Sequence, residues 1–149
     1  MTDDPAPSSL RTLRRCVAGA VVLAFLIALK SPTLLLEHQR QWSEGWTLLL
    51  VGLMGPFEGQ FGWCANLAMA WTVVVLLLGR RPPLIVCLVG AALAVSTRFT
   101  LHEISSDVRQ QVLAFGPGYY LWAGCSLALL VHAAADRAMA ARPDGPGAP

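Results

Sequence analysis

The chain has 149 residues, enough for one domain, and a formal net charge of +2. Apolar residues make up 55% of it and charged residues only 13%, about half the charged share expected of a soluble globular domain. The charges gather in short clusters between long apolar runs, and no basic patch with interleaved aromatic residues is present, so nucleic acid is not an expected partner. This composition is typical of a multi-pass membrane protein whose main partner is the lipid bilayer.

Four apolar runs are predicted to span the membrane. The clearest is residues 61–79, which carries no charge and is followed directly by Arg80-Arg81-Pro82-Pro83. Nineteen helical residues cover roughly 28 Å, about the thickness of the hydrocarbon core of a bilayer. The other three spans are predicted at about 13–31, 84–101 and 118–135.

The two ends of the chain are predicted to be disordered cytoplasmic tails, at residues 1–12 and 138–149, because they are polar or rich in proline and glycine. A basic patch before the first apolar run is also found in signal peptides. However, no Ala-x-Ala-like cleavage site follows, since the run ends in Leu29-Lys30-Ser31-Pro32. We therefore favour an uncleaved anchor helix.

Two outer segments, at about 34–54 and 104–115, are predicted to be amphipathic helices at the membrane surface. The apolar run 46–54 would form only about 14 Å of helix, so it either lies in the interface or dips part-way into the membrane. In the second segment, Ile104, Val108, Val112 and Phe115 recur at helical spacing among polar residues. The predicted fold is all-α: an integral-membrane four-helix bundle with interfacial helices on its outer side.

The distribution of Lys and Arg predicts the orientation of the four spans. One side of the membrane would hold Arg11, Arg14, Arg15, Arg80, Arg81, Arg137 and Arg142, and the other side Lys30, Arg40, Arg98 and Arg109. The side richer in Arg is cytoplasmic by the positive-inside rule. We therefore expect a bacterial inner (plasma) membrane protein with both termini in the cytoplasm.

Aromatic residues gather at the outer ends of the predicted spans, whereas such belts normally occur at both interfaces. They would either anchor the protein in the headgroup region or line an outer groove for a lipid or a partner helix. The junction between the run 46–54 and the start of the second span is the place where we expect a site. The candidate contacts at this outer mouth are Trp46, Trp63, Asn66, Arg98, Tyr119 and Trp122.

The sequence carries no recognisable catalytic or metal-binding pattern, so we expect no enzyme and no cofactor. The four cysteines, Cys16, Cys64, Cys87 and Cys125, form no CxxC pair and lie in apolar runs, where free cysteine usually packs as a small hydrophobe. Lys30 and Arg98 at outer span ends, and His132 near an inner end, are explained by their access to water.

Polar and small residues within the spans are predicted to serve helix packing. Asn66 and Thr72 in the second span should hydrogen-bond a neighbouring helix, with a gate or ligand contact as the less favoured alternative. Small residues four apart allow helix backbones to approach closely. Such pairs are Ala20 and Ala24, Gly90 and Ala94, and Gly124 and Ala128.

Short motifs resemble those of a loose group of small bacterial inner-membrane proteins that have no assigned activity. The matching residues are Gly45-Trp46-Thr47-Leu48-Leu49 with Gly52 and Gly55, then Trp63-Cys64-Ala65-Asn66, Gly79-Arg80-Arg81, and Gly116-Pro117-Gly118-Tyr119-Tyr120-Leu121-Trp122. The resemblance covers about two-thirds of the chain, implies four spans and assigns a role to no residue.

Two functions are compatible with these observations. The favoured one is a non-enzymatic accessory or scaffold subunit that acts through helix packing and its outer loops, with another membrane protein or a second copy as partner. The alternative is a small transporter, channel or lipid-binding protein, in which Asn66, Thr72, Arg98 or Glu103 faces a cavity. A cavity that reaches these side chains would favour the alternative.

Overall fold

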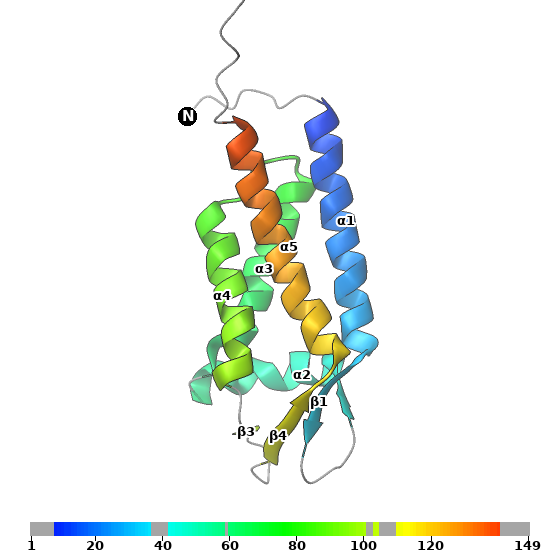
Figure 1. The fold of residues 1–149 in the computed structure, drawn as a ribbon, viewed down its shortest axis with the longest axis vertical. Coiled ribbons are helices and arrows are strands. Elements are labelled where there is room, and N and C mark those ends of the chain that lie inside the picture. The colour runs from blue at the N-terminus through cyan, green and yellow to red at the C-terminus, as the bar shows by residue number, and fades with distance from the viewer. Residues whose placement is uncertain (1–7, 37–41, 59, 101–102, 105–109, 141–149) are drawn as a thin grey trace, which may run out of the picture.

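The computed structural model describes residues 8–36, 42–58, 60–100, 103–104 and 110–140 (Figure 1). Its main body consists of four long helices, α1 (Ser8–Lys30), α3 (Cys64–Leu77), α4 (Leu84–Thr100) and α5 (Pro117–Ala140). The start of α1, the turn between α3 and α4, and the end of α5 lie at one end of the bundle, which we call the terminal end. The opposite end carries a small sheet and is called the sheet end.

The four helices pack around a narrow centre of small side chains. Helices α1 and α4 lie at opposite corners, and each packs against both α3 and α5. Ala18, Ala65 and Ala94 are fully buried between them. Gly90 of α4 faces Ala68 of α3 so closely that an added Cβ would lie 2.9 Å from the Ala68 Cβ. Close helix contact of this kind requires small residues at the interface.

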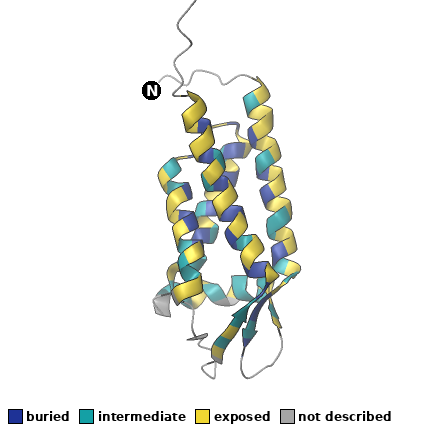
Figure 2. Ribbon diagram, viewed as in Figure 1, coloured by how far each residue is buried: buried dark blue, intermediate teal, exposed yellow. Residues whose placement is uncertain are grey.

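All four helices carry exposed residues along their length (Figure 2), and many of these are large and apolar. The exposed fraction is 61% for Leu23 on α1, 58% for Leu67 on α3, 70% for Ile85 on α4 and 67% for Val131 on α5. A bundle in water would place polar residues on these faces. The outward faces therefore suit apolar surroundings better than water.

Two helices, α1 and α5, are long and apolar enough to cross a membrane, by length and composition. The segment from Phe61 to Leu77 meets the same criterion only together with Gly45–Pro56, from which it is bent by 118°. Helix α4 is a shorter apolar helix. The structure thus confirms a mostly helical chain that contains two helices able to cross a membrane by length and composition.

The sheet end is closed by four short antiparallel strands in the order β2-β1-β4-β3. They are β1 (Pro32–Leu36), β2 (Trp42–Glu44), β3 (Glu103–Ile104) and β4 (Gln110–Phe115). Pro32 ends α1, and β1 then pairs with β4 in a register that places Leu34 opposite Phe115. The amide of Gly116 extends this pairing by donating to the Thr33 carbonyl at 2.8 Å.

A short helical segment lies across the sheet end of the bundle (Figure 1). It consists of α2 (Gly45–Val51) and the 3₁₀ helix η1 (Gly52–Glu58), and a second 3₁₀ helix, η2 (Phe61–Trp63), leads into α3. We call α2 and η1 together the cap. The last carbonyls of an α-helix have no partner within the helix. One of them, that of Leu49, accepts a hydrogen bond from Trp63 Nε1 at 2.8 Å, which fastens the cap to the start of α3.

The predicted surface helix over residues 104–115 is wrong. Residues Gln110–Phe115 form β4, and residues 105–109 lie outside the described part. Val112 and Ala114 are more buried than Gln111 and Leu113, which is the alternation of a strand. A short apolar run fits a strand or a helix equally well, and here the distant partner β1 decides.

The predicted helix over residues 34–54 is only partly present. Residues Pro32–Leu36 are strand β1 and Trp42–Glu44 are strand β2, so the helix begins at Gly45 rather than at residue 34. The apolar run 46–54 is helical, as predicted, and belongs to the cap.

The predicted span boundaries differ slightly from the helices. Helix α1 begins at Ser8 and α5 continues to Ala140, so both helices extend into the segments predicted as tails. Residues 1–7 and 141–149, the rest of those tails, lie outside the described part, as do Arg40, Arg109 and Arg142 of the topology argument.

A buried ion pair joins three segments at the terminal end. Arg14 Nε donates to Asp136 Oδ2 at 2.9 Å, and Arg14 Nη1 donates to the Gly79 carbonyl at 2.7 Å. The two side chains are only 2% and 4% exposed. Gly79 ends α3 with a φ of 74°, a left-handed conformation that glycine adopts readily. The pair therefore links α1, α5 and the turn that leads to α4.

Candidate functional site

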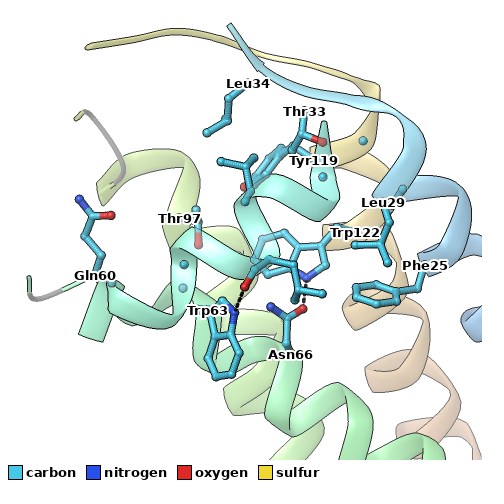
Figure 3. Close-up of a pocket in the computed structure, with 18 of the residues that line it drawn as sticks. Phe25, Leu29, Thr33, Leu34, Gln60, Trp63, Asn66, Thr97, Tyr119 and Trp122 are labelled. Atoms are coloured by element: carbon cyan, nitrogen blue, oxygen red, sulfur yellow. Dashed lines mark hydrogen bonds between the residues drawn. The ribbon is translucent and has the colours of Figure 1, made fainter. Parts of the chain in front are cut away.

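A cavity of about 150 Å³ lies between the sheet end of the bundle and the cap (Figure 3). Segments far apart in the chain contribute to it: the end of α1, β1, the cap, η2, and one end each of α3, α4 and α5. Its lining residues are Phe25, Ala28, Leu29, Thr33, Leu34, Gly45, Leu48, Leu49, Gly52, Met54, Gly55, Gln60, Gly62, Trp63, Asn66, Thr97, Gly118, Tyr119 and Trp122. No charged residue is among these described residues.

Aromatic side chains form much of the wall and are held by hydrogen bonds. Trp122 Nε1 on α5 donates to Asn66 Oδ1 on α3 at 2.7 Å. The Tyr119 hydroxyl donates to the Ala94 carbonyl on α4 at 3.0 Å, and its ring lies 5.9 Å from that of Trp122. Because each polar tip has a partner on a different helix, the aromatic rings are fixed relative to the bundle.

The cap reaches the cavity through close backbone contacts. The Gly45 amide donates to the Ser31 carbonyl at 3.3 Å, and an added Cβ on Gly45 would lie 2.5 Å from the Ala28 carbonyl oxygen. Gly118, at the start of α5, faces the same stretch, since its Cβ would lie 2.9 Å from the Ser31 carbonyl oxygen. Glycine at these positions lets the cap and α5 close around the end of α1.

The size and lining of the cavity favour an apolar guest. An apolar cavity of about 150 Å³ holds a molecule such as benzene and stays dry when it is empty. The Thr33 and Thr97 hydroxyls donate within the chain, to the Ser31 and Leu93 carbonyls. A water molecule needs two to four polar partners, and the lining offers few.

Four of the six predicted outer-mouth residues meet at this cavity: Trp63, Asn66, Tyr119 and Trp122. Trp46 and Arg98 do not line it. Trp46 is exposed and donates to Glu44 Oε2 at 2.6 Å, while the Arg98 guanidinium lies 4.7 Å from the centre of the Phe115 ring. The six residues remain predicted ligand or partner contacts, and the structure separates them into these two groups.

Other predicted positions lie away from the cavity. The Thr72 hydroxyl is buried and donates to the Ala68 carbonyl of its own helix at 2.8 Å. It also hydrogen-bonds a neighbouring helix, as predicted, because its oxygen lies 3.7 Å from Cys87 Sγ on α4. Lys30 is exposed at the end of α1, and His132 is partly buried near the terminal end. The side chain of Glu103 lies outside the described part.

Several lining residues carry no signal in the sequence. Leu48, Leu49 and Thr97 resemble any other residue of an apolar run, and Phe25 lies within another such run. Their role depends on how the cap folds back over α1 and α4, which no local pattern reveals. The sequence does not reveal the Arg14–Asp136 pair either, because arginines beside apolar runs are explained by the positive-inside rule alone.

A second, much smaller cavity of about 10 Å³ lies between α3, α4 and α5. It is lined by Thr72, Cys87 and Ser126 among apolar residues. Cys87 and Cys125 are buried, as expected of packing cysteines, whereas Cys16 is exposed. Within the described ranges no three His, Cys, Asp or Glu side chains gather in a way that would hold a metal ion.

Comparisons with known proteins found no matching family, no matching curated protein and no matching solved structure. The short motifs shared with small bacterial inner-membrane proteins therefore gain no further support. The cavity and the apolar outward faces of the helices are the features that bear on function.

Proposed function

We propose that this chain is a non-enzymatic multi-pass protein of the bacterial inner membrane that binds the apolar part of a small or lipid-like molecule in the sheet-end cavity. In this proposal all four long helices cross the membrane, and the terminal end faces the cytoplasm. The cap and the sheet then lie at the outer surface, where the cavity meets the outer leaflet.

The outward faces of the helices support the four-span arrangement. Helices α3 and α4 are shorter than α1 and α5, but they too present large apolar side chains on their outward faces. Together, η2 and α3 cover roughly 27 Å and α4 roughly 25 Å, close to the thickness of the hydrocarbon core. The greater number of arginines at the terminal end supports the orientation.

The cavity is the observation that carries the binding proposal. It is apolar, bounded by aromatic rings whose polar tips are fixed, and large enough for one six-membered ring. It also lies at the outer mouth, where the sequence predicts a site. Binding sites for small molecules are usually preformed, mostly apolar cavities with a few oriented polar groups.

A larger side chain that fills the cavity should abolish binding. Two leucines on the cap provide the test and its control. Leu48 lines the cavity, whereas Leu50 on the same helix is 58% exposed and does not line it. A molecule that binds only the folded state at 100 times its Kd stabilises that state by about 2.7 kcal/mol. Saturating toluene should therefore raise the Tm of the detergent-solubilised wild type and of Leu50→Trp by several degrees, and should leave the Tm of Leu48→Trp unchanged.

The measurement is thermal unfolding of each purified full-length variant with and without toluene. An equal effect of toluene on Leu48→Trp and Leu50→Trp would show that the ring binds elsewhere. No effect on the wild type would contradict the proposed function.

The role of an accessory or scaffold subunit stays a prediction. It requires a protein partner, and no described feature identifies the surface that such a partner would cover. The cavity favours ligand binding instead, since it brings Asn66 and three aromatic residues of the predicted outer mouth together.

A further inference from the structure

The orientation of the Asn66 amide is fixed by its neighbour. An indole N–H can only donate, so the Asn66 atom that lies 2.7 Å from Trp122 Nε1 must be the oxygen. The amide nitrogen consequently points the other way, toward the side of Trp63 (Figure 3). Within the described part of the chain, this nitrogen donates to no protein acceptor.

The indole and hydroxyl donors of four other lining residues are already used. Trp63 donates to Leu49, Tyr119 to Ala94, and the two threonines to backbone carbonyls of their own segments. Gln60 has a partner of its own. The Asn66 amide nitrogen is therefore a donor that the cavity offers to a guest, and a guest without an acceptor would leave it unpaired.

The remaining features define the shape and charge of the guest. The volume corresponds to one six-membered ring, and the walls include the rings of Phe25, Trp63, Tyr119 and Trp122. The described lining holds no charged side chain, which favours a neutral guest.

We propose that the cavity takes a six-membered ring that bears a carbonyl oxygen, the chemistry of a quinone headgroup, and that this oxygen accepts a hydrogen bond from Asn66 Nδ2. The ring packs against the aromatic walls, and the carbonyl selects the guest. This inference rests on the proposed function and names the class of its ligand.

Two probes of similar size separate the carbonyl from the ring. Acetophenone and ethylbenzene both contain one benzene ring with a two-carbon substituent, and only acetophenone carries an acceptor. The substitution Asn66→Asp keeps an oxygen for Trp122 and replaces the donor by a second oxygen. Gln111→Glu makes the same chemical change at an exposed position on β4 and serves as the control.

The experiment compares the affinities of the two probes for full-length protein in one detergent, measured from the ligand dependence of Tm. The two probes partition differently into micelles, but this difference is the same for every variant. The ratio of the two affinities can therefore be compared between variants. We expect the preference for acetophenone to fall by about tenfold or more in Asn66→Asp and to stay at the wild-type value in Gln111→Glu.

Each outcome bears on one of the two proposals. If both probes bind the wild type and their ratio is the same in Asn66→Asp, the carbonyl inference is wrong while the proposed function stands. If neither probe binds the wild type, the proposed function itself is contradicted. If Asn66→Asp does not fold, a wild type that binds both probes without preferring acetophenone would still overturn the inference.

Discussion

Replacing Asp136 by asparagine should lower the free energy of unfolding by about 3–5 kcal/mol, because it leaves the buried Arg14 guanidinium without its counter-charge. Arg14 is 2% exposed and Asp136 4%, so water reaches neither side chain. The Gly79 carbonyl still accepts a hydrogen bond from Arg14, but a neutral carbonyl does not balance a full charge. The measurement is equilibrium unfolding of the full chain by titration with SDS in mixed micelles.

Two further variants separate the loss of the pair from a general effect at this end of α5. Arg137 is the exposed neighbour of Asp136, and Arg137→Ala should change stability by less than about 0.5 kcal/mol. The double variant Arg14→Met with Asp136→Leu removes both charges, and it should recover most of the lost stability. Unfolding of Asp136→Asn at the wild-type SDS concentration would show that the pair is not buried as described.

Replacing Gly45 by alanine should destabilise the protein by about 1–3 kcal/mol and weaken ligand binding, although alanine is the better helix former. The new Cβ would lie 2.5 Å from the Ala28 carbonyl oxygen and 3.0 Å from the Leu29 Cα. Both are backbone atoms that cannot turn aside, so the cap must move away from α1. Since the cap forms one wall of the cavity, the stabilisation by toluene should decrease together with the Tm.

Gly124 provides the matched control for this substitution. It lies in the interior of α5, and an added Cβ there meets nothing within 4 Å. Gly124→Ala should therefore stabilise the protein by about 0.5–1 kcal/mol through the higher helix propensity of alanine, and it should bind toluene like the wild type. The two Gly→Ala variants thus have opposite expected signs, and a similar loss of stability in both would contradict the assigned contact of the cap with α1.

The sequence predicts the helices well because their signals are local. The uncharged run 61–79 and the Arg-Arg-Pro-Pro turn correspond to η2, α3 and the start of α4 within a few residues. Pro32 and Gly116-Pro117 mark the end of α1 and the start of α5 for the same reason. Composition and proline positions are properties of short segments, so a single sequence is enough to identify them.

The sheet and the ion pair depend on contacts between distant residues. The predicted helix over 104–115 fails because β4 is defined by its pairing with β1, about 80 residues earlier in the chain. Arg14 and Asp136 are separated by 122 residues, and neither belongs to a motif that announces the other. Local periodicity carries no information about such partners.

The location of the candidate site was partly predictable. The aromatic belt and the polar Asn66 indicated the outer mouth, and four of the six candidate residues do line the cavity. Trp46 and Arg98 share only their position along the chain with these four residues, and their side chains contact Glu44 and Phe115 instead. The glycines that seat the cap, above all Gly45, could not be assigned a role before the contact with α1 was known.

The most direct test of the cavity is diffraction from a crystal of the full chain under xenon pressure. Xenon enters dry apolar cavities of about this size, and ordered water occupies polar ones. We expect a xenon atom between Leu48, Trp63 and Trp122 in the wild type, and none there in Leu48→Trp. Side chains that fill this space in the wild type, or a cluster of ordered water molecules in place of xenon, would contradict an apolar ligand site at the sheet end.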